Sequence, residues 1–341
     1  MYIIKQQPED FIVTEINHFD ILEKGRYIYF KLKKRNRTVL DVIKEIAKQL
    51  NLKEKQIGFA GTKDKNAITE QFCSVQGTTK EKLLKVNLEN VSLEFIGYNP
   101  NPLSLGELEG NHFEITVRNL EEFSIEPTTH LPNYFDEQRF STHNIDIGKH
   151  LIKKEFKEAT KLIDDTRSEK HLGNHPQDFV GALKKLPNRL LKMYIHAYQS
   201  YLWNETLSTY LKNQNQQVKE VPYSAGTFIF IKNPEPFLEL NVPLIGFASE
   251  DLETNEQIKE IIHHSMLKEN ISYRDFIIKQ IPELSSEGGT RTAFIEVKEL
   301  KIEDQQPDEL TPGKNKIKIS FILGKGSYAT LVIKKILNTL K

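Results

Sequence analysis

Cysteine is almost missing from this sequence, and no stretch of it is apolar enough to cross a membrane. Cys73 is the only cysteine among the 341 residues, which excludes an internal disulfide and a cysteine-based structural zinc cluster. No apolar run approaches the roughly 18 residues that a spanning helix needs. The opening segment MYIIKQQPEDF contains acidic residues and no apolar signal-peptide core. We therefore expect a cytoplasmic protein that is not attached to a membrane.

The sequence also lacks an excess of either charge. It has 47 Lys+Arg and 47 Asp+Glu, so its formal net charge is zero, whereas nucleic-acid-binding proteins commonly carry a basic excess. The charges are unevenly spread, however. Residues 31–65 hold eleven basic and four acidic side chains, and residues 314–341 hold seven lysines and no acid. One interpretation is a set of solvated charged faces. The other is a divided surface whose basic part attracts phosphates.

The period of the hydrophobic residues predicts the fold class. Alternating runs predict strands in residues 11–15, 27–33, 91–98 and 112–118, and Thr38 is expected to cap a helix between them. Beyond about residue 145 the period becomes helical and predicts one helix over residues 152–163 and a longer one over residues 188–211. The chain ends with an alternating run and a last helix that Ser327 is expected to cap and that is expected to continue to Leu340. This order indicates an α+β fold whose sheet domain is interrupted by an insertion. The expected parts are residues 1–145, a mainly helical α+β insertion over residues 146–289, and residues 290–341.

The segment Ile57–Gln71, IGFAGTKDKNAITEQ, concentrates the residues that could carry chemistry. An apolar start leads to Gly61 and then to Asp64, which has a lysine on each side. A surface hairpin with a charged tip is one interpretation. A phosphate-binding P-loop is excluded because it requires a Gly-Lys-Ser/Thr sequence, and here an aspartate follows Lys63.

This segment resembles the signature loop of the TruD family of pseudouridine synthases, approximately A-G-x-K-D-x-x-A-x-T-x-Q. Five further blocks resemble family elements in the same order along the chain, which makes a chance match very improbable. These blocks are KQQPEDFIVTEI (Lys5–Ile16), GNHFEI (Gly110–Ile115), PNYFDEQRFS (Pro132–Ser141), AYQSYLWN (Ala197–Asn204) and FILGKGSYAT (Phe321–Thr330). Asp136 and Ser141 depart from the pattern, because the family usually has glycine at both positions. If those glycines require a positive φ, the turn there is in doubt.

The resemblance implies a pseudouridine-synthase-type catalytic domain with a mixed or antiparallel sheet. Such enzymes convert uridine in RNA to pseudouridine, and the family's usual target is uridine 13 in the D arm of tRNA. The reaction has no redox change and loses no group, so no cofactor and no metal are expected. By resemblance Asp64 is the essential carboxylate, acting as nucleophile or base. Lys5 is its expected cationic partner, since a nearby cation stabilises the ionised carboxylate; a solvated edge lysine is the alternative.

The substrate uridine has to leave its stack and enter a pocket, and an aromatic ring is a common platform for a flipped base. The resemblance makes Phe113 the candidate platform and Asn111 a candidate for bonding the base or orienting the loop. Phe113 also alternates with Ile115 and Val117, which is the pattern of a plain core residue. The candidate RNA contacts are Lys63, Lys65, Arg139, Tyr134 and Lys325, with buried packing as the alternative for the tyrosine.

The sequence thus predicts a tRNA pseudouridine synthase, an intramolecular transferase, with tRNA as its partner. A monomer is compatible with this interpretation. Two alternatives stay open: a catalytically inactive tRNA-binding protein of the same fold, and a synthase that acts on other RNA sites. Replacement of Asp64 would have indicated the first, but the aspartate is present.

Overall fold

The structure is a computed structural model that describes residues 2–121 and 123–339, with side chains through residue 337. The chain divides into two compact units. The first unit comprises Met1–Thr129, Glu296–Ala329 and Ile336–Lys341, and the second comprises His130–Ile295 and Thr330–Lys335. The second unit therefore begins before the expected insertion and takes in the PNYFDEQRFS block. None of the helices in the described part of the chain is long and apolar enough to span a bilayer.

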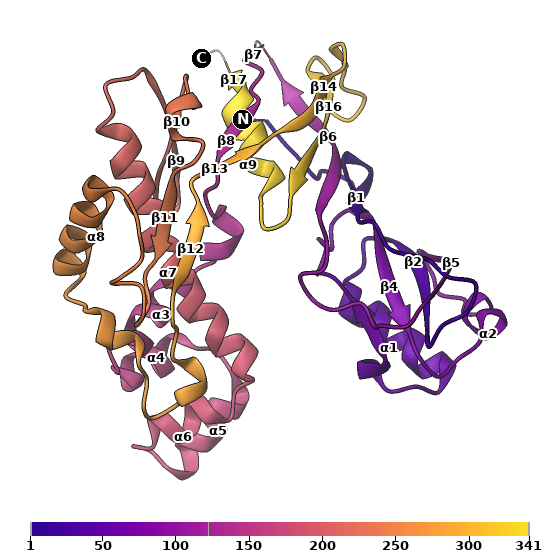
Figure 1. Ribbon diagram of the computed structural model, residues 1–341, viewed down its shortest axis with the longest axis horizontal. Coiled ribbons are helices and arrows are strands. Elements are labelled where there is room, and N and C mark those ends of the chain that lie inside the picture. The colour runs from indigo at the N-terminus through magenta and orange to yellow at the C-terminus, as the bar shows by residue number, and fades with distance from the viewer. Residues whose placement is uncertain (1, 122, 340–341) are drawn as a thin grey trace. The chain divides into compact units, whose positions relative to one another are not determined.

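A nine-stranded sheet forms the frame of the first unit (Figure 1). Its main path runs in the order β14-β16-β6-β1-β4-β2-β5, while β3 pairs with β4 and β15 with β16. Strands β1 and β4 are parallel and their neighbours are antiparallel, so the sheet is mixed and the α+β expectation is confirmed. The strands are β1 (Phe11–Ile16), β2 (Tyr27–Arg35), β3 (Ile57–Phe59), β4 (Ile68–Val75), β5 (Val91–Asn99), β6 (Gly110–Leu120), β14 (Lys298–Ile302), β15 (Gln306–Pro307) and β16 (Asn315–Gly324).

The register of five adjacent strands places two rows of side chains on one face of this sheet. Because aligned residues of neighbouring strands point to the same side, each row can be read from the strand pairing. In the order β16, β6, β1, β4 and β2, the first row is Phe321, Phe113, Val13, Thr69 and Lys34. The second row lies two residues along each strand and contains Leu323, Asn111, Glu15, Gln71 and Leu32. Apolar and polar side chains therefore share this face.

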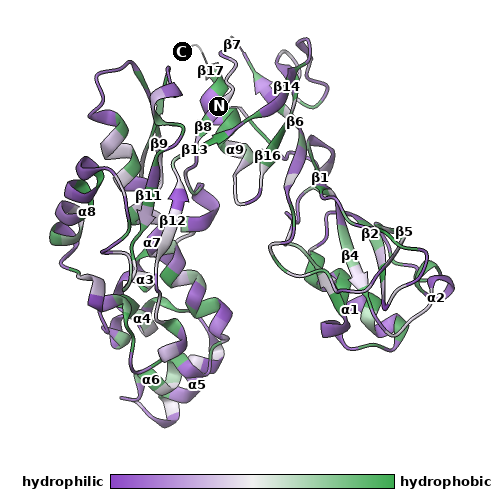
Figure 2. Ribbon diagram, viewed as in Figure 1, coloured by the Kyte–Doolittle hydropathy of each residue, from purple (hydrophilic) through white to green (hydrophobic). Residues whose placement is uncertain are grey.

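Helix α1 (Val39–Leu50) packs on the part of the sheet formed by β2 and β4. Thr38 caps it, since its side chain accepts a hydrogen bond from the main chain of Asp41 at 3.2 Å. The helix carries apolar and polar residues on different sides, as Figure 2 shows. Its buried side chains form a core with Phe30, Leu32 and Cys73. Burial raises the pKa of the Cys73 thiol, so it packs as a small apolar residue.

The first unit also contains a short helix and a strand pair. Helix α2 (Lys80–Leu84) precedes β5, and β7 (Phe123–Ile125) pairs with β17 (Leu337–Thr339). The last helix, α9 (Ala329–Ile336), belongs to the second unit over Thr330–Lys335. It ends at β17 instead of continuing toward Leu340 as expected, and Leu340 lies outside the described residues. The expected Ser327 cap is wrong, because the hydroxyl of this serine is buried without a hydrogen-bond partner.

The second unit is mainly helical. Its elements are α3 (Asn144–Ile152), α4 (Phe156–Leu162), α5 (Thr166–Asn174), α6 (Phe179–Lys184), α7 (Asn188–Lys212) and α8 (Glu256–Glu269), with strands β8 (His130–Pro132), β9 (Val218–Tyr223), β10 (Gly226–Ile231), β11 (Asn241–Leu244), β12 (Gly289–Thr292) and β13 (Phe294–Glu296). The expected long helix over residues 188–211 is α7. The pattern at residues 152–163 does not form one helix, because Lys154 adopts a left-handed conformation with φ 59° and its ammonium bonds to Asp275. A tertiary contact interrupts the helical period there.

Candidate active site

The loop between β3 and β4, residues 60–67, carries Asp64 and is called the Asp64 loop below. The carboxylate of Asp64 is 35% exposed, and its Oδ1 lies 3.3 Å from Nζ of Lys5. The expected partnership of these two residues is therefore present in the structure. The ammonium at this distance orients the carboxylate, and the partial exposure of Asp64 leaves the carboxylate open to a reacting molecule.

Lys5 is held by its backbone and by its neighbours. It is one of the few non-glycine residues with a left-handed backbone, with φ 61°. Two main-chain hydrogen bonds join Ile3 to Arg118 of β6, which fixes the chain just before it. The Lys5 ammonium also lies 4.0 Å from the centroid of the Phe11 ring, close enough for a cation–π contact. The side chain is thus directed toward Asp64 from a fixed turn.

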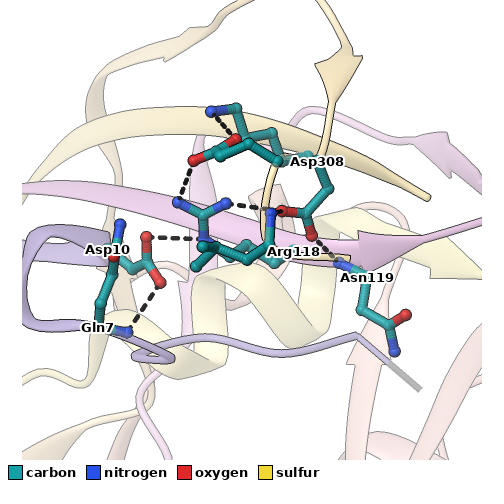
Figure 3. Close-up of polar contacts among 8 residues, drawn as sticks. Gln7, Asp10, Arg118, Asn119 and Asp308 are labelled. Atoms are coloured by element: carbon teal, nitrogen blue, oxygen red, sulfur yellow. Dashed lines mark hydrogen bonds and ion pairs between the residues drawn. The ribbon is translucent and has the colours of Figure 1, made fainter. Parts of the chain in front are cut away.

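A buried ionic network ties this turn to the sheet. The turn η1 (Pro8–Asp10) follows Lys5, and the carboxylate of Asp10 accepts from the main-chain nitrogen of Gln7 at 3.1 Å. Arg118 donates to Asp10 at 2.9 Å and to Asp308 at 2.7 Å. Figure 3 shows its guanidinium between these two carboxylates, with Asn119 bonded to Asp308 through its main chain. The network joins three distant parts of the sequence, at Asp10, Arg118 and Asp308, and so anchors the turn that follows Lys5.

Three aromatic rings share this sheet face, and Lys5 contacts one of them, Phe11. Phe113 packs edge-on against Phe11, with ring centroids 6.1 Å apart, and against Phe321 at 5.6 Å. Phe113 is 7% exposed. Phe113 is therefore a packed residue, and it is linked to Lys5 through Phe11, whose ring the Lys5 ammonium contacts.

Asn111 occupies the same face, in the row that contains Glu15 and Gln71. Its amide oxygen is buried and has no hydrogen-bond partner in the described structure. Gly110 precedes it at the start of β6, where a Cβ atom would lie 2.5 Å from the carbonyl oxygen of Leu323. Only glycine allows β6 and β16 to approach this closely, which explains the glycine next to this asparagine.

The lysines expected to contact RNA have different environments. The Lys63 ammonium faces the protein interior and donates to the carboxylate of Glu15 at 2.6 Å, with both side chains largely buried. Lys65 is exposed on the Asp64 loop. Lys325 is exposed on the turn after β16, and its ammonium donates to the carbonyl oxygen of Gly106 at 2.9 Å.

The two remaining candidates, Tyr134 and Arg139, belong to the second unit. Tyr134 is fully buried, its hydroxyl donates to the carbonyl oxygen of Ile229 at 3.1 Å, and it accepts from Ser208. Tyr134 is therefore a packed residue, as in the alternative interpretation given for it above. Arg139 lies in the short turn η3 (Glu137–Phe140) with its guanidinium carbon 5.9 Å from the Phe135 ring centroid.

Comparisons with known proteins show which family this sequence belongs to. The sequence profile described as tRNA pseudouridine synthase D (TruD) matches residues 2–169 and 166–336. The chain is 31% identical to the tRNA pseudouridine synthase D of Aquifex aeolicus, covering 98% of this chain and 97% of the relative. It is 32% identical to "Probable tRNA pseudouridine synthase D 1" of Methanococcus maripaludis, covering 98% and 99%. This chain belongs to the TruD family.

A solved structure agrees. A crystal structure described as TruD from Methanosarcina mazei superposes with a TM-score of 0.72 at 28% identity and covers 97% of this chain and 92% of that chain. The α+β architecture with its large mixed sheet is therefore that of a TruD protein. As a member of this family, the protein is an isomerase of the tRNA pseudouridine synthase class and a tRNA-modifying enzyme.

The two departures from the TruD pattern have a simple structural explanation. Asp136 has φ −84° and Ser141 has φ −52°, so neither position uses a conformation that favours glycine. The Asp136 carboxylate is bonded within the second unit to Thr330 and to Lys334, the latter at 2.8 Å. In this TruD protein the aspartate thus contributes an ion pair that glycine could not.

Two residues near the Asp64 loop of this TruD protein were not singled out from the sequence. Glu15 is the buried partner of Lys63, and Lys34 donates to the main-chain oxygen of Asp64 at 2.8 Å. The signal for Lys34 was the alternation of Phe30 and Leu32 on the apolar side of β2, which puts Lys34 on that same side. A lysine at an apolar position of a strand is an exception that could have been noticed.

The basic stretches of the sequence are partly paired in this TruD protein. Of the seven lysines at residues 314–341, the four at 314, 316, 318 and 334 form ion pairs with acids from other parts of the chain. In residues 31–65, ion pairs are made by Lys31, Arg35, Arg37 and Lys63. Local charge in the sequence therefore overstates the charge of the surface.

Proposed function

We propose that this protein converts uridine 13 in the D arm of tRNA to pseudouridine, with Asp64 as the catalytic carboxylate. The observation that carries the proposal is the ion pair between Lys5 and Asp64, since this isomerisation requires an oriented, partly exposed carboxylate that can act as nucleophile or base. Family membership supports tRNA as the substrate class.

The reaction needs no external reagent. The N1–C1′ bond breaks, the uracil turns, and a C5–C1′ bond forms, so the proton lost from C5 is balanced by one gained at N1. Asp64 acts at the ribose as a nucleophile or as a base. Lys5 holds the carboxylate in place through their ion pair, and the turn held by Arg118 keeps Lys5 in place.

The flipped uridine is assigned to the sheet face that carries Asn111 and the three aromatic rings. Phe113 supplies an apolar contact for the uracil, while the unpartnered amide oxygen of Asn111 can accept a hydrogen bond. Lys65 and Lys325 are assigned to the RNA backbone because both are exposed cations of this unit. Arg139 is assigned a backbone contact from the second unit, which we propose to be the family's insertion domain.

The test is incubation of the protein with unmodified tRNA transcripts, followed by pseudouridine mapping at single-nucleotide resolution. We expect one modified position, uridine 13. Asp64→Asn is the control: it should abolish modification while tRNA affinity stays within about tenfold, because the change is isosteric and removes only the charge. Modification at a different RNA position would show that the proposed target, uridine 13, is wrong. Activity of Asp64→Asn near that of the wild type would contradict the assigned chemistry.

A further inference from the structure

Lys34 is a buried lysine of β2 that belongs to the apolar side of its strand. It is 1% exposed, whereas its neighbours Lys33 and Arg35 are exposed. In the strand pairing Lys34 lies opposite Thr69 of β4, in the row that also contains Phe113. A buried lysine is costly unless its charge is compensated, so its presence on this face requires a reason.

The surroundings of the Asp64 loop supply that reason. Three interactions fasten this loop to the sheet face, one from each of three strands. Gln71 of β4 donates to the carbonyl oxygen of Gly61 at 3.1 Å, and the carboxylate of Glu15 on β1 accepts from the Lys63 ammonium. The third is the 2.8 Å hydrogen bond from Nζ of Lys34 on β2 to the carbonyl oxygen of Asp64. Of the three, only this one acts on the catalytic residue itself.

The charge of Lys34 is poorly compensated within the protein. In the described part of the chain no carboxylate lies within ion-pair distance of its ammonium, and its acceptor is a neutral carbonyl. Burial lowers the pKa of Lys34 to about 8, an effect that Asp64 opposes and Lys63 increases. Such a group destabilises the fold at neutral pH, and perturbed titratable groups beside a catalytic residue commonly serve the reaction.

We propose that Lys34 is a positioning residue of the isomerisation: its protonated amine holds the main chain of Asp64 so that the carboxylate meets Lys5. The inference rests on the proposed function, because the benefit of fixing Asp64 is catalytic. A hydrogen bond from an ammonium is roughly twice as strong as one from a neutral donor. The loop is therefore held firmly only while Lys34 is charged.

The proposal predicts an alkaline limit to activity. The charged groups near Lys34 are Asp64 and Lys63 on the Asp64 loop, with Lys5 beyond the Asp64 carboxylate and Glu15 beyond the Lys63 ammonium. Activity is present below the pKa of Lys34 and declines as the pH rises through about 8. Stability follows the opposite sign: between this pKa and that of a lysine in the unfolded chain, the unfolded state binds the extra proton, so stability increases with pH.

The experiment compares wild type with Lys34→Met, Lys34→Arg and the exposed neighbour Lys33→Met. We expect Lys34→Met to lower kcat about 100-fold at pH 7, as displacement of a catalytic group does, with an unchanged Kd for tRNA. Its melting temperature should equal or exceed that of wild type, and its residual activity should lack the decline near pH 8. Lys34→Arg should keep part of the activity without that decline, and Lys33→Met should behave as wild type.

Three results would overturn the inference: a kcat of Lys34→Met within about threefold of wild type, an unchanged alkaline decline in that variant, or a large fall in its melting temperature. Failure of the proposed function is separable, because then wild type itself makes no pseudouridine. In that case crystal structures of wild type and Lys34→Met decide. The inference requires the Asp64 carbonyl to move by about 1 Å or more and the Lys5 contact to open; an unmoved Asp64 rejects it.

Discussion

Lys5 and Asp64 come from the start of the chain and from the loop between β3 and β4, and they meet with 3.3 Å between ammonium and carboxylate. Each is fixed by a different device. Lys5 lies in a turn that the Arg118 network anchors to the sheet. Asp64 lies in a loop that hydrogen bonds to side chains of three strands. The pair is thus a product of two rigid supports, and the predictions below test the pair and its supports separately.

Lys5→Gly should lower kcat about 10- to 100-fold, the effect of losing one hydrogen bond or ion contact to a charged group. Glycine adopts the left-handed backbone at this position without strain, so the variant removes the ammonium and leaves the turn intact. Single-turnover kinetics with saturating enzyme measure the effect. Lys5→Arg is the matched variant and should recover part of the rate. Wild-type kcat in Lys5→Gly would contradict the role of the ion pair.

Phe113→Leu should lower turnover about tenfold or more, because stacking of a base on an aromatic ring contributes roughly 1–3 kcal/mol. Leucine keeps the apolar volume, so the free energy of unfolding should fall by less than about 1.5 kcal/mol. Phe113→Ala is less informative, since loss of a buried ring costs about 3–5 kcal/mol. Phe30→Leu, in the α1 core, is the control. If both leucine variants have wild-type kcat, Phe113 serves packing alone.

Arg118→Met should lower the free energy of unfolding by about 3–5 kcal/mol, because it leaves the buried carboxylates of Asp10 and Asp308 without their cation. Urea denaturation at pH 7 measures this change. Activity at a temperature where the variant stays folded should also fall, since the Lys5 turn loses its anchor. An unchanged denaturation midpoint would show that the network contributes nothing to stability.

The same network predicts a loss of stability in acid. Burial acts to raise the pKa of Asp308, but the hydrogen bonds from the main chain of Asn119 and Leu310 and from Arg118 outweigh it, and the pKa is lowered. A carboxyl with a lowered pKa stabilises the fold above its unfolded value of about 3.9, and this contribution disappears as the pH falls through the folded value. Melting temperatures from pH 6 to pH 2 should show this decline, and Asp308→Asn should show less of it. Equal declines in the wild type and in Asp308→Asn would show that other groups cause the loss of stability in acid.

Binding of tRNA should weaken with salt, with log K falling by about 0.7–0.9 per neutralised phosphate for each unit of log salt concentration. Because many lysines of the two basic stretches are already paired, the slope should be smaller than the number of basic residues there suggests. Lys65→Ala and Lys325→Ala should each reduce the magnitude of this slope by about one, the contribution of one phosphate contact. Lys316→Ala is the control, since this lysine is paired with Glu309. A salt-independent affinity would exclude these phosphate contacts.

Short-range features of the sequence determined much of this protein. The alternation in β1, β2, β6 and β16 and the cap at Thr38 follow from side-chain period and local hydrogen bonding. The order of motifs around Asp64 led to the family and to Lys5, because those residues occupy fixed places in short blocks. The helix expected over residues 152–163 was wrong where a distant residue, Asp275, interrupts it.

The tertiary structure decided what depends on contacts between distant residues. It placed Arg118 between Asp10 and Asp308, turned Lys63 inward to Glu15, and set Lys34 under the main chain of Asp64. It also paired most of the basic tail, which the sequence presented as free charge. The physical reason is the same throughout. Strand pairing joins residues that are far apart in the chain, and whether a charged side chain is paired or free depends on its neighbours in space. The zero net charge of the sequence therefore includes many charges that form ion pairs within the protein.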